Sequence, residues 1–110
     1  IIWEQEAEKI HNRIRGLEPW PGAYTFYKSA RLRVCKAEKA PGAERDQPGC
    51  VARVSDHGIE VGTGQGRLVI TVLQPEGKKR MAAKCYLRGH GIRAGDRLGN
   101  DSPVMSNNNS

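Results

Sequence analysis

The stretch from Arg15 to Tyr24, with the sequence RGLEPWPGAY, constrains the fold more than any other part of the chain. A helical pattern ends at Gly16, which can take the positive φ that closes a helix. Pro19 and Pro21 cannot continue that helix, and they hold the backbone extended around Trp20. We therefore expect a rigid corner between a helix and a strand, with Trp20 largely buried, so that Trp20→Ala would cost about 3–5 kcal/mol.

The length of 110 residues suits one domain with a modest core. No apolar run approaches the roughly 20 residues that span a bilayer, so we expect no membrane segment. No charged and then apolar leader precedes a small-residue cleavage site, so secretion is not indicated. Because the chain opens on Ile1 in what resembles a helix lead-in, we expect a piece of a longer protein whose catalytic part is missing.

The three cysteines are widely spaced, odd in number and without a CxxC pair, which argues against a disulfide framework or a zinc knuckle. The histidines are equally scattered. Only Cys85 and His90 lie close enough in the sequence to suggest a metal site, and two ligands are too few for one. We expect reduced thiols and no bound metal.

Positive charge is gathered in two blocks, and their placement says more than the net charge of +6. Residues 28–39 hold five basic side chains against one acidic side chain, and residues 76–97 hold seven against two. A solvated basic face is the ordinary explanation of one such block. Two blocks on a small domain favour a polyanionic partner, with nucleic acid as the first candidate.

The hydrophobic pattern predicts a mainly β domain with a helix near each end. An amphipathic helix is expected over residues 4–15, with glutamates early and arginines late, as the helix dipole favours. Short strands are expected at 23–27, 31–34, 50–55, 59–63 and 67–73, and the last of these is apolar enough to lie at the centre of the sheet.

The later segments are mostly turns. The glycines at 62, 64 and 66 lack the spacing of a nucleotide-phosphate loop, so a tight hairpin is expected. Residues 74–80 are expected to break the central strand. A helix should follow over residues 81–88, with Met81, Cys85 and Leu87 facing inward, and then a turn into a last short strand near residue 98. Residues 39–49 are expected to form a mobile loop, and residues 100–110 a disordered polar tail.

Basic residues at two places are candidates for contact with nucleic acid. Arg31 and Arg33 alternate with apolar residues in an expected strand, which puts both on its solvent face. The run Lys78-Lys79-Arg80 follows Pro75 and Gly77 at the end of the expected central strand, and we expect it to form one positive surface with the strand face. Ordinary surface charge is the alternative for that run. The full candidate set is Arg31, Arg33, Lys36, Lys78, Lys79, Arg80 and Lys84.

Several strings resemble the C-terminal domain of the folate-dependent formyltransferases, particularly methionyl-tRNA formyltransferase. The corner RGLEPWPGA matches the entry to that domain, and the other strings follow in the same order over roughly residues 1–99. These are Pro48-Gly49, Gly62-Thr63-Gly64-Gln65-Gly66, the basic-loop string Leu73-Gln74-Pro75-Glu76-Gly77-Lys78-Lys79-Arg80-Met81, and Gly95-Asp96-Arg97-Leu98. The basic-loop string is the specific part, because relatives acting on small molecules share the corner more than this loop.

The resemblance implies a small Greek-key β-barrel similar to an OB-fold, with an N-terminal linker helix and a short C-terminal helix. Residues 1–18 would link it to a missing folate-binding catalytic domain, residues 19–99 would form the tRNA-binding barrel, and residues 100–110 the tail. The corner residues Gly16, Pro19, Trp20 and Pro21 would form the structural hinge. The Asn, His and Asp that transfer the formyl group belong to the missing domain, so no catalytic residue is assigned here.

The function implied is tRNA binding in an enzyme that moves a formyl group from 10-formyltetrahydrofolate to methionyl initiator tRNA. The fragment itself would hold no cofactor, transfer no formyl group, and act as a monomer in bacterial cytoplasm or an organelle. One alternative is the C-terminal domain of a formyltransferase or hydrolase with a small-molecule substrate. Another is a free-standing single-strand-binding barrel, for which the chain offers few stacking aromatics. Tyr24, Phe26 and Tyr27 lie near the first basic block and give weak support for base stacking.

Overall fold

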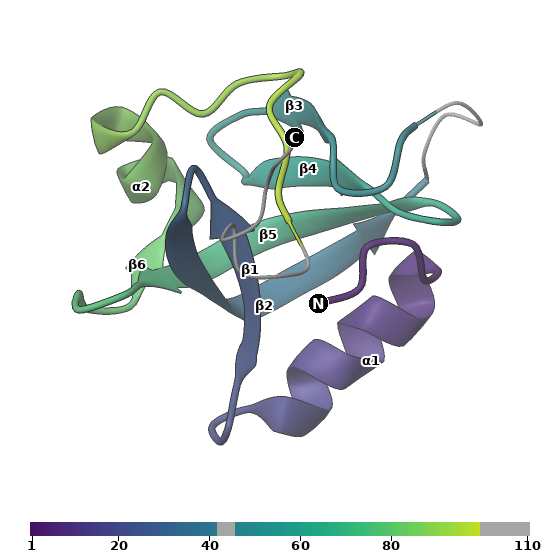
Figure 1. Ribbon diagram of the computed structural model, residues 1–110, viewed down its shortest axis with the longest axis horizontal. Coiled ribbons are helices and arrows are strands. Elements are labelled where there is room, and N and C mark those ends of the chain that lie inside the picture. The colour runs from purple at the N-terminus through teal and green to yellow at the C-terminus, as the bar shows by residue number, and fades with distance from the viewer. Residues whose placement is uncertain (42–45, 100–110) are drawn as a thin grey trace, which may run out of the picture.

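A six-stranded antiparallel sheet and two short helices make up the fold, as Figure 1 shows. The computed structural model describes residues 1–41 and 46–99. The tail expected at residues 100–110, and part of the loop expected at 39–49, lie outside the described residues. The elements are α1 (Ala7–Leu17), β1 (Ala23–Tyr27), β2 (Ala30–Ala40), β3 (Val51–Val54), β4 (Ile59–Gly62), β5 (Arg67–Pro75), β6 (Met81–Ala82) and α2 (Ala83–Gly89).

Strand β5 lies at the centre of the sheet, as its apolar sequence predicts. The strand order is β1-β2-β5-β4-β3, with β6 pairing with the distal half of β5. Leu68, Ile70 and Leu73 of β5 are each at most 1% exposed. The predicted break at residue 74 was wrong, because β5 continues through Pro75, which lies opposite Leu32 of β2. A proline is accommodated there because a strand end no longer needs its N–H for the ladder.

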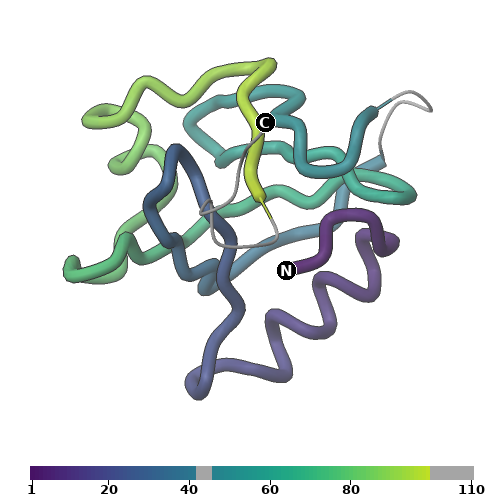
Figure 2. Tube along the Cα trace, viewed as in Figure 1, coloured from purple at the N-terminus to yellow at the C-terminus, as the bar shows by residue number. Residues whose placement is uncertain are grey.

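The expected barrel does not close. Within residues 1–41 and 46–99, β1 and β3 form the two ends of the strand path, and no ladder joins them. The segment after α2 runs between these two ends (Figure 2). It makes single antiparallel bridges, Arg97 with Cys50 and Gly99 with Phe26, in place of the last short strand that the sequence predicted. Two isolated bridges satisfy a few backbone groups, but they do not turn an open antiparallel sheet into a barrel.

The tryptophan of the core is Trp3, which the sequence pattern had placed in a helix lead-in. Helix α1 begins only at Ala7, and the segment before it lies against the sheet (Figure 1). Trp3 is 1% exposed, and its indole Nε1 donates to Thr25 Oγ1 at 3.0 Å. The Gly64 N–H donates to the backbone oxygens of Trp3 and Gln5, at 3.1 and 2.9 Å. The N-terminal segment is therefore fastened both to β1 and to the turn before β5.

The corner around Trp20 is built differently from the prediction. Trp20 is 81% exposed, so the expectation that it is buried was wrong, and with it the expected cost of Trp20→Ala. Gly16 lies inside α1, and the residue with positive φ is Gly22, at +95°. The Gly22 N–H donates to the oxygen of Leu17 at 2.8 Å, so the chain closes into a tight turn with Trp20 near its tip.

Both helices differ slightly from their predicted bounds. In α1 the residues Ala7, Ile10 and Ile14 are buried, as the apolar spacing predicts, although the helix starts and ends later than expected. The segment predicted as one helix begins instead with β6, where Met81 pairs with Leu73, and only then becomes α2. Cys85 is exposed, in contradiction to its expected inward position, because the shorter helix turns Ala83 and Tyr86 toward the core.

Asp96 gives the fold a predictable pH dependence. Its carboxylate accepts hydrogen bonds from the Arg93 backbone N–H at 3.1 Å and from the Tyr27 hydroxyl at 3.0 Å, and these bonds hold its pKa below the ordinary 3.8. A lowered pKa stabilises the fold above the ordinary value and ceases to do so as the pH falls through the shifted value. We expect Asp96→Asn to lower the melting temperature at pH 7, and the difference from wild type to shrink steadily below pH 3.8 in parallel melting curves. A difference that does not change with pH would contradict this role.

Candidate functional site

A row of polar side chains crosses three neighbouring strands on the outer face of the sheet. Tyr24 of β1 lies opposite Arg33 of β2, and Arg33 lies opposite Gln74 of β5. The neighbours of Arg33 in β2, Leu32 and Val34, are 2% and 0% exposed. Because side chains alternate along a strand, this confirms that Arg31 and Arg33 lie on the face away from the core.

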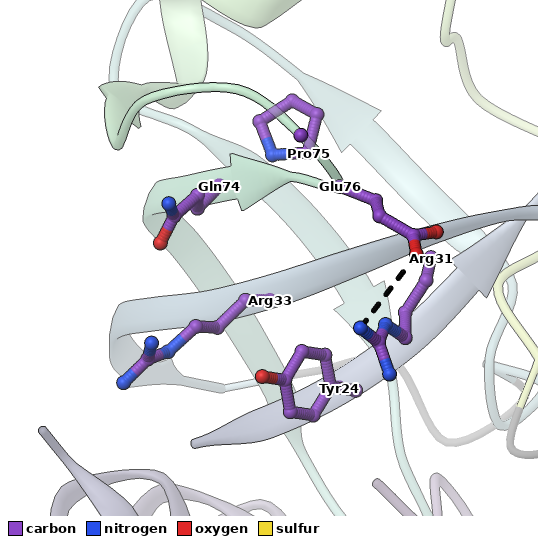
Figure 3. Close-up of a pocket in the computed structure, with 7 residues that line it drawn as sticks. Tyr24, Arg31, Arg33, Gln74, Pro75 and Glu76 are labelled. Carbon is purple, nitrogen blue, oxygen red and sulfur yellow. Dashed lines mark ion pairs between the residues drawn. The ribbon is translucent and has the colours of Figure 1, made fainter. Parts of the chain in front are cut away.

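This row borders a shallow pocket of about 150 Å³, shown in Figure 3. In that view Arg33 and Gln74 extend side by side, while Arg31 and Glu76 point toward each other. The guanidinium of Arg31 lies over the Tyr24 ring, 4.6 Å from its centroid, and Arg31 Nη2 is 3.7 Å from a Glu76 carboxylate oxygen. The lining residues are Tyr24, Arg31, Arg33, Gln74, Pro75, Glu76 and Gly77.

One carboxylate, that of Glu18, joins two of the predicted arginines. Arg33 donates to it through Nε at 3.0 Å and Nη2 at 3.2 Å, and Arg80 donates through Nη2 at 3.1 Å. The hydrogen bond that Arg33 donates to Glu18 raises the pKa of Arg33 against the smaller opposing effect of desolvation, so Arg33 stays charged. Arg33 is only 17% exposed, whereas Arg80 is 49% exposed. Arg80 therefore offers more of its charge to solvent than Arg33 does.

The basic loop lies at the same end of the sheet as Arg31 and Arg33. Lys78, Lys79 and Arg80 are all exposed in the connection between β5 and β6. The Gln74 side-chain amide donates to the Lys78 oxygen at 2.8 Å, which fixes the loop against the polar row. We call the group Arg31, Arg33, Lys78, Lys79 and Arg80 the basic end surface.

Two predicted residues lie outside that group. Lys36 is exposed on β2 opposite Val72, beyond an irregularity in the β2–β5 register, and Lys84 is exposed on α2. Val72 also pairs with Ala82, two residues before Lys84, so both lysines flank one stretch of β5. Neither lysine lines the pocket.

Several residues of the site were not predicted from the sequence. Glu18, Gln74 and Glu76 each contact a predicted basic residue. Tyr24, which the sequence suggested only as an aromatic for base stacking, carries the ring beneath Arg31. The pairing of β1 with β2 through a short turn offered a signal for Tyr24, because it places that residue opposite Arg33. No local signal pointed to Glu18, which reaches its partners across 15 and 62 residues.

The site is suited to binding an anion rather than to metal or thiol chemistry. Within residues 1–41 and 46–99 no group of three or more His, Cys, Asp or Glu side chains is placed to hold a metal ion. Cys35, Cys50 and Cys85 are free thiols, and burial raises the pKa of Cys35. Among the helices that the structure describes, none has the length and apolar character needed to cross a bilayer.

Comparison with known proteins assigns the chain to a family. The model of the formyl transferase C-terminal domain matches residues 1–91, which includes α1, the whole sheet and α2. The chain belongs to the formyl transferase C-terminal domain family. The family match thus covers every residue of the basic end surface.

Three similar proteins from different bacteria are named methionyl-tRNA formyltransferase. That of Moorella thermoacetica is 44% identical over 99 residues, 90% of this chain and 32% of the relative. That of Bacillus licheniformis is 42% identical over 102 residues, 92% of this chain and 32% of the relative. That of Thermus thermophilus is 40% identical over 95 residues, 86% of this chain and 30% of the relative. This formyl transferase C-terminal domain therefore spans about a third of the length of these relatives.

Proposed function

We propose that this chain is the tRNA-binding part of a methionyl-tRNA formyltransferase. The complete enzyme would transfer a formyl group from 10-formyltetrahydrofolate to the amino group of methionyl initiator tRNA in the bacterial cytoplasm. A separate folate-binding domain would perform the chemistry. The present chain would act as a monomeric appendage that holds the tRNA backbone.

The observation that carries this proposal is the basic end surface itself. Five cationic side chains from β2 and the β5–β6 connection gather at one end of the sheet, although 45 residues separate Arg33 from Lys78 in the sequence. Clustered lysines and arginines attract phosphates whatever the base sequence, and folded RNA is recognised largely through its shape and backbone. The names of the relatives supply the class of RNA.

The carboxylates at this surface do not cancel its charge. Glu18 is 17% exposed and accepts from two guanidinium groups, while Glu76 lies 3.7 Å from Arg31. Among the described residues, these are the two carboxylates that pair with the surface, against its five cationic side chains. The surface therefore keeps a net positive charge, and its carboxylates orient the arginines that a phosphate would meet.

A salt series with initiator tRNA tests the proposal. We expect the triple variant Lys78→Ala, Lys79→Ala, Arg80→Ala to lower the slope of log affinity against log salt, by about one unit for each phosphate left without its cationic partner. Filter binding from low to high salt gives the slope. Other folded RNAs should be weakened about equally, because backbone contacts carry no base information.

The matched control removes the same charge from elsewhere. Lys9 in the first half of α1, Lys39 near the end of β2 and Arg53 of β3 are exposed and lie outside the basic end surface. Their triple alanine variant should keep the wild-type slope within a fraction of a unit. If both triple variants lower the slope equally, only the overall charge of the chain matters. If the Lys78, Lys79 and Arg80 variant keeps the wild-type slope, the RNA does not contact that loop.

A second measurement tests whether this chain has formyl-transfer activity of its own. We expect the purified chain to produce no formylmethionyl-tRNA when it is supplied with 10-formyltetrahydrofolate and methionyl-tRNA, because its polar site lacks an acid–base constellation. The product can be followed by its loss of a free α-amino group. Turnover by this chain alone would overturn the assignment of the chemistry to another domain.

A further inference from the structure

Trp20 stands out because the sequence places it in a rigid corner and the structure leaves it in solvent. Its side chain is 81% exposed, whereas the other tryptophan, Trp3, is 1% exposed. An indole buries more apolar area than almost any other side chain when it finds a partner. Leaving it exposed gives the folded chain little, so the ring is better explained by a contact with another molecule.

The corner holds this indole in place. Pro19 and Pro21 flank it, and their rings restrict the backbone on both sides of Trp20. The Arg33 guanidinium donates to the backbone oxygen of Pro19. The Tyr24 hydroxyl donates to the backbone oxygen of Pro21 at 3.4 Å. A backbone tied on both sides of Trp20 loses little conformational freedom on binding, which favours a stacking contact.

The surroundings of the corner identify the class of partner. Glu18, two residues before Trp20, accepts from Arg33 and Arg80, so the corner adjoins the basic end surface. An exposed aromatic ring beside clustered guanidinium groups is the arrangement with which proteins hold unpaired nucleotides, the cations taking the phosphates and the ring taking a base.

We propose that Trp20 stacks on an unpaired nucleobase of RNA bound at the basic end surface. This inference rests on the proposed function and adds to it a contact that backbone electrostatics alone cannot supply. Paired bases in a helix are not available for such stacking, whereas bases in loops and single-stranded ends are. With Trp20 beside it, the basic end surface would favour RNA that has an unpaired strand next to a duplex.

The test uses a hairpin RNA that is closed by a non-nucleotide linker and carries an unpaired 3′ tail, so that the tail holds its unpaired bases. The same linker-closed hairpin without the tail is the comparison. We expect Trp20→Ala to weaken binding of the tailed hairpin about tenfold, within the range of one base–aromatic stack. Trp20→Phe should retain most of the affinity. Binding of the blunt hairpin should not change, nor should the salt slope with either RNA, since the substitution removes no charge. Both variants should melt like wild type because the side chain is exposed.

Tryptophan fluorescence supplies an independent readout. Trp3 is shielded, so the acrylamide-quenchable emission should come from Trp20, and it should disappear in Trp20→Phe. The tailed hairpin should quench this emission in the wild-type chain. Unchanged emission, together with unchanged affinity of Trp20→Ala for the tailed hairpin, would overturn the inference and assign the indole to a protein contact.

The failure of this inference can be told apart from failure of the proposed function. If the Lys78, Lys79 and Arg80 triple variant loses RNA affinity while Trp20→Ala binds like wild type, only the stacking contact is overturned. If the triple variant also binds like wild type, the basic end surface is not an RNA-binding surface and both proposals fall. Equal weakening of the tailed and blunt hairpins by Trp20→Ala would likewise overturn stacking on an unpaired base.

Discussion

Replacement of Trp3 by alanine is expected to lower the free energy of unfolding by about 3–5 kcal/mol, the usual cost of removing a large buried aromatic. Trp3 is 1% exposed and belongs to the core formed by α1 and the sheet. Its indole N–H also donates to Thr25 Oγ1, a group that is itself 0% exposed. The variant would leave a cavity and remove the indole that binds this hydroxyl.

Trp20→Ala is the matched control, because it makes the same chemical change at an exposed position. Its free energy of unfolding should stay within about 0.5 kcal/mol of wild type, as for most surface substitutions. Urea unfolding followed by circular dichroism measures both variants without relying on tryptophan emission. If the two variants lose similar stability, the N-terminal segment does not contribute to the core as the structure indicates.

Gly64→Ala is expected to destabilise the fold by an amount at the upper end of the roughly 1–3 kcal/mol seen for overpacked interiors. A Cβ on Gly64 would lie 1.9 Å from the backbone oxygen of Glu4, so backbone has to move. The N-terminal segment would be pushed away, or the turn before β5 would open. Either movement strains the two hydrogen bonds from the Gly64 N–H, to the oxygens of Trp3 and Gln5.

Gly16→Ala, also a glycine-to-alanine substitution, is expected to stabilise the fold. Gly16 lies inside α1, and a Cβ there meets no atom within 4 Å. Alanine should therefore stabilise the helix by about 0.5–1 kcal/mol. Thermal unfolding should show a higher melting temperature for Gly16→Ala and a lower one for Gly64→Ala, so the pair tests the helix and the turn together. A loss of stability in Gly16→Ala would instead support the helix-closing role that the sequence suggested for this glycine.

The parts of the fold that sequence predicted well are those fixed by local pattern. The apolar run of β5 marked the centre of the sheet, and the alternation of Arg31, Leu32 and Arg33 gave the correct faces of β2. Both signals come from neighbouring residues, whose orientation follows from strand geometry alone.

The errors occurred where long-range contacts decide the outcome. Trp20 was expected to be buried because the flanking prolines restrict its backbone. A restricted backbone fixes the direction of the side chain, but it does not determine whether that direction is toward the core or toward solvent. Trp3 fills that core from a segment with no helical or strand periodicity of its own. Closure of the sheet likewise depends on how β1 and β3 meet residues 97–99, and no local pattern encodes that meeting.

In the candidate site, too, local features were predicted from the sequence and long-range contacts were not. The basic residues were identified from their clustering in the sequence, and the structure brings Arg33 and Arg80 to one carboxylate. The identity of that carboxylate could not be inferred, because Glu18 was one of several acidic residues near α1. Pairing across 62 residues is a property of the folded chain, which no local charge pattern encodes.

The sharing of Glu18 makes α1, β2 and the β5–β6 connection mechanically interdependent. Glu18 follows the last residue of α1, so a shift of the helix end would carry Arg33 and Arg80 with it as one unit. Alanine substitutions at these two arginines should then be non-additive in tRNA affinity, because the first releases the anchor of the second. A domain joined to α1 would thus control the position of both positive charges by moving a single helix.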